Sequence, residues 1–134
     1  MTPYIHFQGN CREAMTAYQS IFGGKLDVMV YGDMPGGEPR HVGSTAVMHS
    51  ALMTDEVGDL QGSDFPPGVE GDAQKAISIS IQLATVERAK EVNDALLEGG
   101  AVAVPFGPTF FSPGFGMLRD RFGTHWIIMS APQA

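Results

Sequence analysis

NCREAMTAYQSIFGG, residues Asn10 to Gly24, decides the fold of this 134-residue chain, because a divergent copy of its plan recurs at Thr85 to Gly100, TVERAKEVNDALLEGG. Each stretch follows a short β-like run, carries apolar residues at three- and four-residue steps, and stops at a glycine pair. Such spacing predicts an amphipathic helix, and a terminal glycine supplies the left-handed residue at which helices commonly end. We therefore expect one structural unit that occurs twice.

The start of each helix is predicted from its capping residues. Asn10 is the expected N-cap of the first helix, with Glu13 completing a reciprocal capping box. Thr85 is the expected N-cap of the second, where Arg88 stands in place of the acidic residue. The residues predicted to face the core are Cys11, Ala14, Met15, Tyr18, Ile21 and Phe22 in the first helix, and Val86, Ala89, Val92, Leu96 and Leu97 in the second.

Short β-like runs surround each helix in the same order. The predicted strands are 3–8, 25–33, 42–54 and 59–64 in the first half, and 75–84, 101–106, 115–121 and 124–130 in the second. Each half therefore has the order β-α-β-β-β, which does not fit a doubly wound sheet, where helix and strand alternate throughout. The predicted class is α+β, with two repeated βαβββ modules forming a curved mixed sheet with a central trough.

The chain length is that of a single domain. We predict one domain, with modules at 1–65 and 75–134 joined by a linker, 66–74, that is rich in proline, glycine and acidic residues. Two further stretches rich in glycine and proline, 34–41 and 107–114, are predicted loops. The first is either a lid over a site or a surface excursion.

Composition excludes several partners. A formal net charge of −7 disfavours nucleic acid, whose binding rests on Lys and Arg, and no basic run suggests an anionic membrane. No stretch approaches the length of a transmembrane helix, and the N-terminus lacks a signal-peptide pattern. The single cysteine, Cys11, cannot form an internal disulfide and is interpreted as a packing residue. These features predict a cytoplasmic protein.

Four segments resemble the vicinal oxygen chelate superfamily, which includes glyoxalase I, extradiol dioxygenases and bleomycin resistance proteins, and within it the PhnB-like branch. They are PYIHFQGNCREAMTAYQSIFGG, GDMPGG, LQGSD and DRFGTHWIIM. The resemblance covers nearly the whole chain and implies a homodimer, because a second chain often completes the trough. Some members of this branch carry the name of a demethylubiquinone methyltransferase. Methyl transfer is not expected, because the sequence has no glycine-rich strand-to-helix turn.

The resemblance also implies where a metal would bind. Enzymes of the superfamily hold a divalent metal through one residue from each of four strands, commonly His, Glu or Gln. The corresponding positions here are Pro3, Gly62, Ser80 and Ile127, none of which is a competent ligand. A count that slips by one residue changes the face of the strand, and allowing for this, Gln61 and His6 are the only ligand-type residues nearby. We expect no classical metal centre and no cofactor, with a divalent metal as the alternative.

Nine residues are candidates for binding a small molecule in the trough: His6, His49, Gln61, Ser80, Phe110, Phe111, Met117, Arg119 and Trp126. All of them except Gln61 and Arg119 have a structural alternative. His6 and His49 either line the trough or are a half-exposed strand histidine and a core histidine, and Ser80 either lines a cavity or faces solvent. Trp126 and Met117 are alternatively core, and Phe110 and Phe111 dimer contacts. His41 and His125 are interpreted as loop and turn residues.

Three functions are compatible with these features. The preferred hypothesis is a bleomycin-resistance-like protein that binds a small molecule without chemistry. The alternative is a lyase, isomerase or dioxygenase that uses a divalent metal, and a further alternative is a non-catalytic structural dimer.

Overall fold

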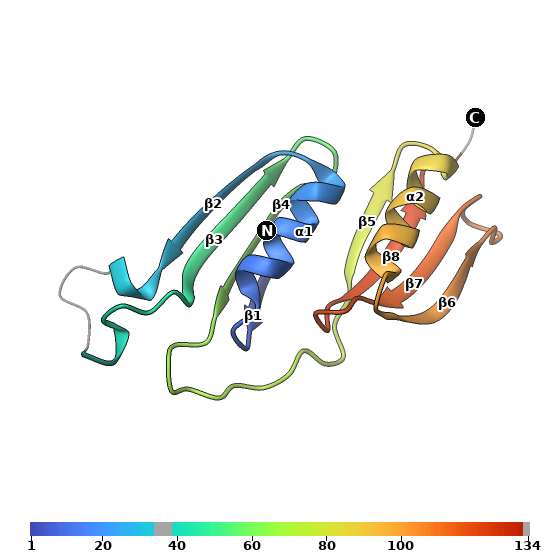
Figure 1. The fold of residues 1–134 in the computed structure, drawn as a ribbon. Coiled ribbons are helices and arrows are strands. Elements are labelled where there is room, and N and C mark those ends of the chain that lie inside the picture. The colour runs from blue at the N-terminus through green and yellow to red at the C-terminus, as the bar shows by residue number, and fades with distance from the viewer. Residues whose placement is uncertain (34–38, 133–134) are drawn as a thin grey trace. The chain divides into compact units, whose positions relative to one another are not determined.

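The repeat seen in the sequence is also a repeat of structure. The computed structural model describes residues 1–33 and 39–132, and the chain divides into two units, Met1–Ala73 and Gln74–Ala134 (Figure 1). The division falls in the predicted linker. No helix in the described part of the chain is long and apolar enough to cross a bilayer.

Unit 1 contains one helix and a four-stranded sheet in the order β1-β4-β3-β2. Strand β1 pairs with β4 in parallel, and the other pairs are antiparallel. Two 3₁₀ turns, Tyr31–Asp33 and Pro39–His41, follow β2. The elements are β1 Tyr4–Phe7, α1 Cys11–Phe22, β2 Lys25–Val30, β3 Val47–Thr54 and β4 Gly58–Asp64.

Unit 2 repeats this topology. Its sheet has the order β5-β8-β7-β6, with β5 parallel to β8 and the remaining pairs antiparallel. The elements are β5 Ile79–Leu83, α2 Val86–Leu97, β6 Ala101–Gly107, β7 Phe115–Arg119 and β8 His125–Ser130. The predicted α+β fold with two βαβββ modules is thus confirmed.

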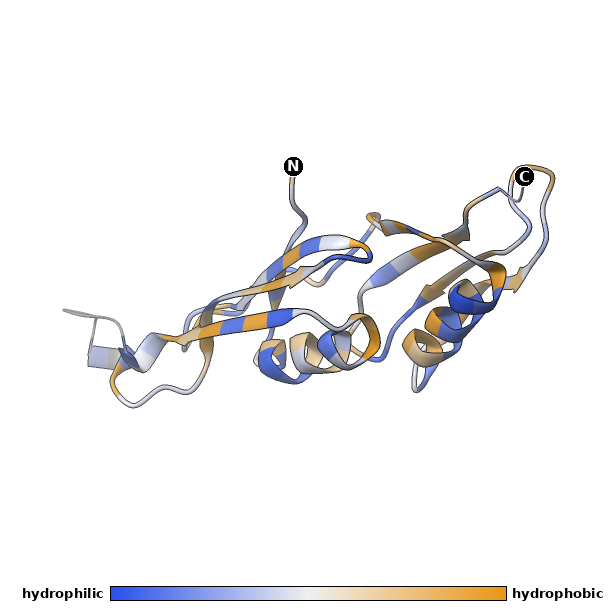
Figure 2. Ribbon diagram, turned by 90° about the horizontal axis from the view of Figure 1, so that it is seen from above, coloured by the Kyte–Doolittle hydropathy of each residue, from blue (hydrophilic) through white to orange (hydrophobic). Residues whose placement is uncertain are grey.

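Each helix packs on one face of its own sheet and builds a separate core. Apolar and polar residues alternate along helices and strands (Figure 2). Of the predicted core-facing residues, Ile21, Val86 and Leu97 are only partly buried, whereas Asn93, which was not predicted, is buried. The buried helical residues are Cys11, Ala14, Met15, Tyr18 and Phe22 in α1, and Ala89, Val92, Asn93 and Leu96 in α2.

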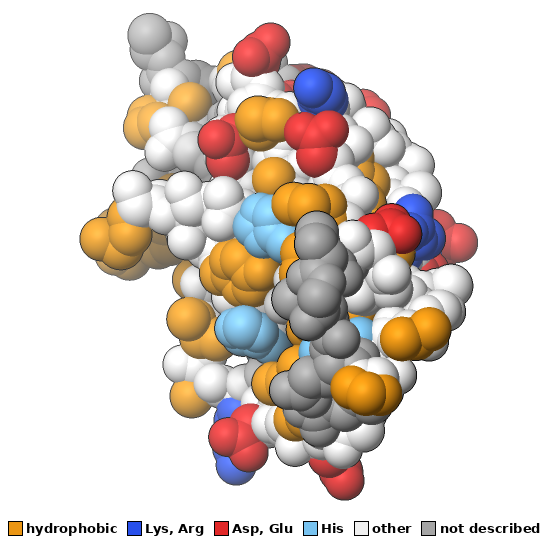
Figure 3. All heavy atoms as spheres, turned by 90° about the vertical axis from the view of Figure 1, so that its left-hand side faces the viewer, with side chains coloured by type: hydrophobic (Ala, Val, Ile, Leu, Met, Phe, Trp, Pro, Cys, Tyr) orange, Lys and Arg blue, Asp and Glu red, His pale blue; other side chains and the backbone are white. Residues whose placement is uncertain are grey.

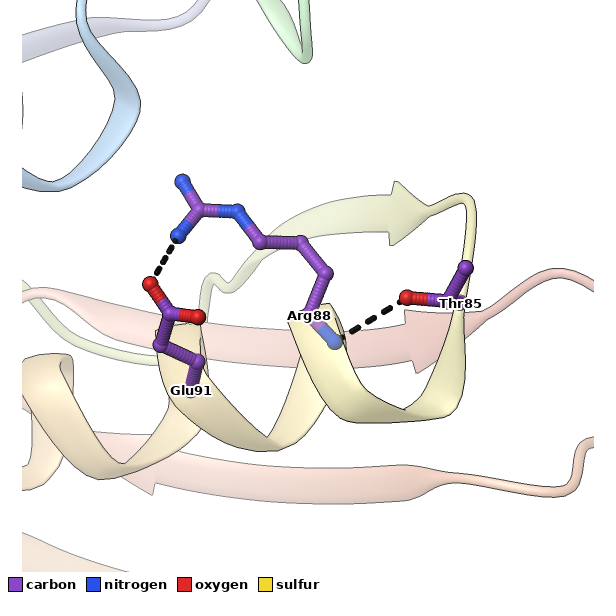
Figure 4. A network of polar contacts seen from close by, with 3 residues as sticks. All are labelled: Thr85, Arg88 and Glu91. Atoms are coloured by element: carbon purple, nitrogen blue, oxygen red, sulfur yellow. Dashed lines mark hydrogen bonds and ion pairs between the residues drawn. The ribbon is translucent and has the colours of Figure 1, made fainter.

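The two helices begin differently. In α2 the prediction is correct: the Thr85 hydroxyl oxygen accepts a hydrogen bond of 3.1 Å from the backbone N–H of Arg88, whose guanidinium contacts Glu91 at 2.8 Å (Figure 4). In α1 the predicted cap is wrong, because the Asn10 side chain makes no capping bond. The buried carboxylate of Asp64 accepts the bond from the Cys11 N–H instead, at 2.9 Å.

The second glycine of each pair is fixed by a close approach to a neighbouring strand. A Cβ on Gly24 would overlap the carbonyl oxygen of Met53 at the end of β3, and a Cβ on Gly100 would overlap that of Arg119 at the end of β7. The pairs therefore end the helices and also allow the next strand to enter the sheet.

Several strands are shorter than predicted. The strand predicted at 25–33 ends at Val30, because Tyr31 turns into the core and its hydroxyl donates to the carbonyl of Asp64 at 2.9 Å. The strand predicted at 42–54 begins only at Val47. The strand predicted at 75–84 begins at Ile79, since Ala76 has a positive φ of 57°. Of the predicted loop 34–41, residues 34–38 lie outside the described residues.

Candidate functional site

Each sheet has one face that its own helix does not cover, which we call the helix-free face. Side chains alternate along a strand, so every second residue lies on that face. In β1 the buried Ile5 and Phe7 point to the helix, and the exposed Tyr4 and His6 point the other way. The units are considered separately below.

Four aromatic rings form a row on the helix-free face of unit 1. Tyr4 and His6 come from β1, His49 from β3, and Phe65 directly follows β4. Ring centroids are 5.5 Å apart for Phe65 and His6, 5.1 Å for His6 and Tyr4, and 5.7 Å for Tyr4 and His49. The Phe65–His6 and Tyr4–His49 pairs are stacked, with interplanar angles of 27° and 26°, whereas the His6–Tyr4 pair is tilted by 39°. We call Phe65, His6, Tyr4 and His49 the ring row.

Hydrogen bonds hold parts of this row. The Tyr4 hydroxyl lies 3.0 Å from Nδ1 of His49, and the Ser63 hydroxyl lies 3.5 Å from Nδ1 of His6, which is at the limit of a hydrogen bond. Gln61 pairs with Tyr4 in the register and belongs to the same face. In the space-filling view, histidine side chains gather among apolar ones (Figure 3).

The helix-free face of unit 1 brings three predicted candidates, His6, His49 and Gln61, together with residues that the sequence reasoning missed. Tyr4, Ser63 and Phe65 were not proposed. A signal for Tyr4 was present in the sequence, because a period of two places it on the same face as His6. No comparable local signal identifies Ser63 and Phe65, since their contacts to His6 depend on the parallel pairing of β1 with β4.

Two of the four positions inferred for a metal contribute no side chain to the helix-free face of a strand. Gly62 lies on the helix side of β4, where an added Cβ would meet Ile5, Phe7 and Cys11. Pro3 precedes β1 and takes part only through its carbonyl, which accepts from the N–H of Gln61 at 3.0 Å.

The residues of the ring row do not fit a classical metal centre. The row contributes two histidines and no carboxylate or thiolate, and the ring of Tyr4 stands next to both histidines. Among the residues described here, no group of three His, Cys, Asp or Glu side chains has the arrangement that could hold a metal ion.

Unit 2 brings together a second group of predicted residues on its helix-free face. Met117 and Ser80 both pair with Ile127 in the register, and Arg119 pairs with His125. Phe111 contacts Phe115 edge-on, with centroids 5.0 Å apart. Phe110 contacts Phe111 in the same manner at 5.0 Å and is 100% exposed.

Trp126 is separated from this group. It is 2% exposed, lies on the helix side of β8, and donates from Nε1 to Oδ2 of Asp120 at 2.9 Å. Its place is the core, which was the structural alternative considered from the sequence.

A cavity of about 240 Å³ lies between α2 and β6 in unit 2. The exposed ion pair between Lys90 and Asp94, 2.7 Å apart, belongs to its lining, and the Lys90 ammonium lowers the pKa of Asp94. Met117 is the only predicted site residue among those that line it. The cavity is lined by residues of unit 2 alone, and they include no titratable cluster suited to catalysis.

Cys11 and His41, which the sequence analysis also considered, are both buried in unit 1. Burial raises the pKa of the Cys11 thiol to about 11, against a smaller lowering by its hydrogen bond with Ser50, so Cys11 is not an activated nucleophile.

The interpretation of His41 as a loop residue needs correction. It ends a 3₁₀ turn, is 9% exposed, and packs on the Tyr31 ring at 5.0 Å with both ring nitrogens unpartnered.

The chain is similar to known proteins over nearly its full length. The family whose sequence model matches residues 1–129 is described as 3-demethylubiquinone-9 3-methyltransferase. Protein YjdN of Escherichia coli strain K12 is 27% identical over 138 residues, which cover 96% of this chain and 92% of YjdN.

Solved structures of other proteins are also similar to this chain over nearly its full length. Protein PA1353 of Pseudomonas aeruginosa is 36% identical with a TM-score of 0.88, and the alignment covers 99% of this chain and 98% of that one. The PhnB protein of Bacillus cereus is 25% identical with a TM-score of 0.77, covering 98% of each chain. A glyoxalase/bleomycin resistance protein from Albidiferax ferrireducens T118 has a TM-score of 0.60, covering 97% of this chain and 98% of that one. At 14% identity, it shows the fold alone.

Proposed function

This chain belongs to the PhnB-like family described as 3-demethylubiquinone-9 3-methyltransferase and has the fold of glyoxalase/bleomycin resistance proteins, and on that premise we propose that it binds a planar small molecule at the ring row of unit 1 without a classical metal centre. The ring row itself is the observation that carries the proposal. Phe65, His6, Tyr4 and His49 place four neighbouring rings, as two stacked pairs, on a sheet face that their own helix does not cover.

The composition of the ring row suits a flat ligand. Aromatic rings bind other rings through large contact areas and offset stacking, and a few polar groups then fix the orientation. Tyr4 is 39% exposed, so part of its surface is available for such a contact. None of the four rings carries a carboxylate or an ammonium group, which favours an aromatic molecule over a highly charged one.

A titration with 2-naphthylmethanol, a neutral planar probe, tests the proposal. We expect the ring resonances of His6 and His49 to shift on binding, and Tyr4→Ala to weaken binding because it removes the ring between the two histidines. Met53→Ala is a matched control, since Met53 is exposed on the same face of β3 but makes no ring contact. Equal binding by Tyr4→Ala and the wild type would reject the ring row as the site.

Two measurements on the purified protein, metal analysis and S-adenosylmethionine binding, distinguish ligand binding without chemistry from the enzymatic alternatives. Stoichiometric zinc, nickel, iron or manganese in protein purified without chelator would favour the divalent-metal lyase, isomerase or dioxygenase. Binding of S-adenosylmethionine in the same assay would favour the methyl transfer that the family description names.

A further inference from the structure

We propose that the ring row selects planar molecules that carry an acceptor oxygen, a carbonyl or a carboxylate, and that this oxygen accepts a hydrogen bond from Nε2 of His49. The inference rests on the proposed function and adds the chemical class of the ligand. It also assigns two roles: His49 is the recognition residue, and Tyr4 is the positioning residue that sets the tautomer of His49.

The tautomer follows from the contact between Tyr4 and His49. A phenol hydroxyl is a good donor, and a neutral imidazole has one nitrogen that donates and one that accepts. The 3.0 Å contact joins the Tyr4 hydroxyl to Nδ1 of His49, so the favourable arrangement has the hydroxyl donating and Nδ1 accepting. The hydrogen bond made by one ring nitrogen determines the state of the other. The proton of neutral His49 then resides on Nε2, which becomes a donor.

That donor is available to a ligand. No hydrogen bond joins Nε2 of His49 to any described residue, and the only buried, unpartnered side-chain nitrogens or oxygens in the described chain belong to His41. Because His49 is half-buried and its Nε2 is not among those atoms, Nε2 reaches the surface of the helix-free face. A ligand oxygen placed there would bond to Nε2 without displacing an internal partner.

No nearby carboxylate of a described residue is placed to accept a hydrogen bond from Nε2 of His49 either. The acidic residues on the same face, Asp27 and Asp59, pair in the register with Ala51 and Met53 and not with His49. Asp27 lies 3.8 Å from the ammonium of Lys25. The net charge of −7 opposes an anionic ligand over long range, but at about 0.1 M salt such repulsion is screened beyond roughly 10 Å. The hydrogen-bonding geometry of His49 therefore decides the preference at short range.

Two probes of the same ring size test this inference. 2-Naphthoate offers acceptor oxygens, whereas 2-naphthylmethylammonium offers only donors. At physiological salt we expect the wild type to bind 2-naphthoate about tenfold more tightly, the gain typical of one hydrogen bond to a charged group. His49→Phe keeps a ring but removes the N–H, so the two affinities should converge, with the ammonium probe little affected. Met53→Ala, outside the ring row, is the matched control and should keep the preference.

The role of Tyr4 has a separate readout. Tyr4→Phe keeps the ring and removes the hydroxyl, so the ¹⁵N shifts of His49 should change from a single Nε2–H tautomer to a mixture. A merely structural role of Tyr4 would leave the tautomer unchanged.

The outcomes are distinguishable. Equal binding of both probes by the wild type, or a preference that survives His49→Phe, overturns the acceptor-oxygen inference and leaves the proposed binding function standing. Tighter binding of the ammonium probe shows that Nε2 accepts, and overturns the tautomer assignment. Failure of both probes to shift the His6 and His49 resonances rejects the ring row as a binding site, and the inference with it.

Discussion

The carboxylate of Asp64, at the end of β4, accepts a hydrogen bond of 2.9 Å from the backbone N–H of Cys11, the first residue of α1. The same oxygen accepts from the N–H of Gly9 at 3.0 Å, and the second carboxylate oxygen accepts from the N–H of Val47 at 2.8 Å. One buried side chain thus joins the end of β4 to the start of α1 and the start of β3. It performs the capping that Asn10 was predicted to perform.

We predict that Asp64→Asn destabilises the protein strongly. The amide keeps one acceptor oxygen but turns an NH₂ group toward a backbone N–H, so at least one buried donor loses its partner. Leaving such a group unsatisfied costs about 1–3 kcal/mol, and loss of the charge at the helix start adds to it. Urea unfolding measures the difference. Asp59→Asn, on the exposed part of β4, should change stability little, and a similar loss in both variants would contradict this role.

A second prediction concerns the two glycines that follow α1. Gly23 and Gly24 both have positive φ, 73° and 89°, but only at Gly24 would a Cβ overlap a neighbouring backbone, that of Met53. Gly23→Ala should cost about 1–3 kcal/mol, because φ 73° with ψ −158° is a conformation that essentially only glycine adopts. Gly24→Ala should cost clearly more, because α1 and β3 must move apart. Equal losses in chemical unfolding would show that the backbone adjusts without strain.

The helices and the order of the strands could be predicted because their causes are local. Apolar spacing, the Thr85 cap and the glycine pairs act within a few residues of one another. The cap of α1 could not be predicted, because Asp64 lies 53 residues beyond Cys11 in the sequence and contacts it only in the folded sheet. The end of β2 was missed for the same reason, since Tyr31 bonds to the distant carbonyl of Asp64.

The candidate site was predicted only in part. Period-two alternation places His6 on one face of its strand, but the phase of β4 relative to β1 depends on register, and a slip of one residue exchanged Gly62 for Gln61. The contact between Tyr4 and His49 joins two strands that are not neighbours, because β4 lies between β1 and β3. No pattern within either strand indicates that contact.

Stability should fall at alkaline pH because of Cys11. Burial raises the pKa of its thiol from 9.0 to about 11, so the folded state holds a proton that the unfolded chain releases. The contribution is fully present below pH 9 and is lost as pH rises through about 11, with a total of the order of 3 kcal/mol. Thermal melts between pH 8 and pH 11 measure this loss.

Cys11→Ala is the control for that experiment and should flatten the decline. A residual slope is expected in the variant, because burial, followed by the charges of Tyr4 and Asp64, also raises the pKa of Tyr31. An unchanged slope in Cys11→Ala would show that the thiol ionises equally in the folded and unfolded states.

The last prediction concerns Phe110 and Phe111, which were considered either as ligand contacts or as dimer contacts. The loop that presents them is ordered by hydrogen bonds: the Thr109 N–H donates to the carbonyl of Ser112 at 2.8 Å, and the Ser112 N–H donates to the Thr109 hydroxyl at 3.1 Å. An ordered loop that presents a fully exposed phenylalanine is suited to protein–protein contact, because the loop loses little conformational entropy when it binds.

We therefore expect a homodimer whose dissociation constant rises at least about tenfold in Phe110→Ser, as is typical for removal of an aromatic anchor. Light scattering over a concentration series measures this, and Val42→Ser, which removes an exposed apolar side chain from unit 1, should leave the equilibrium unchanged. An unaltered dimer in Phe110→Ser that also binds 2-naphthylmethanol less tightly would assign the loop to ligand contact instead.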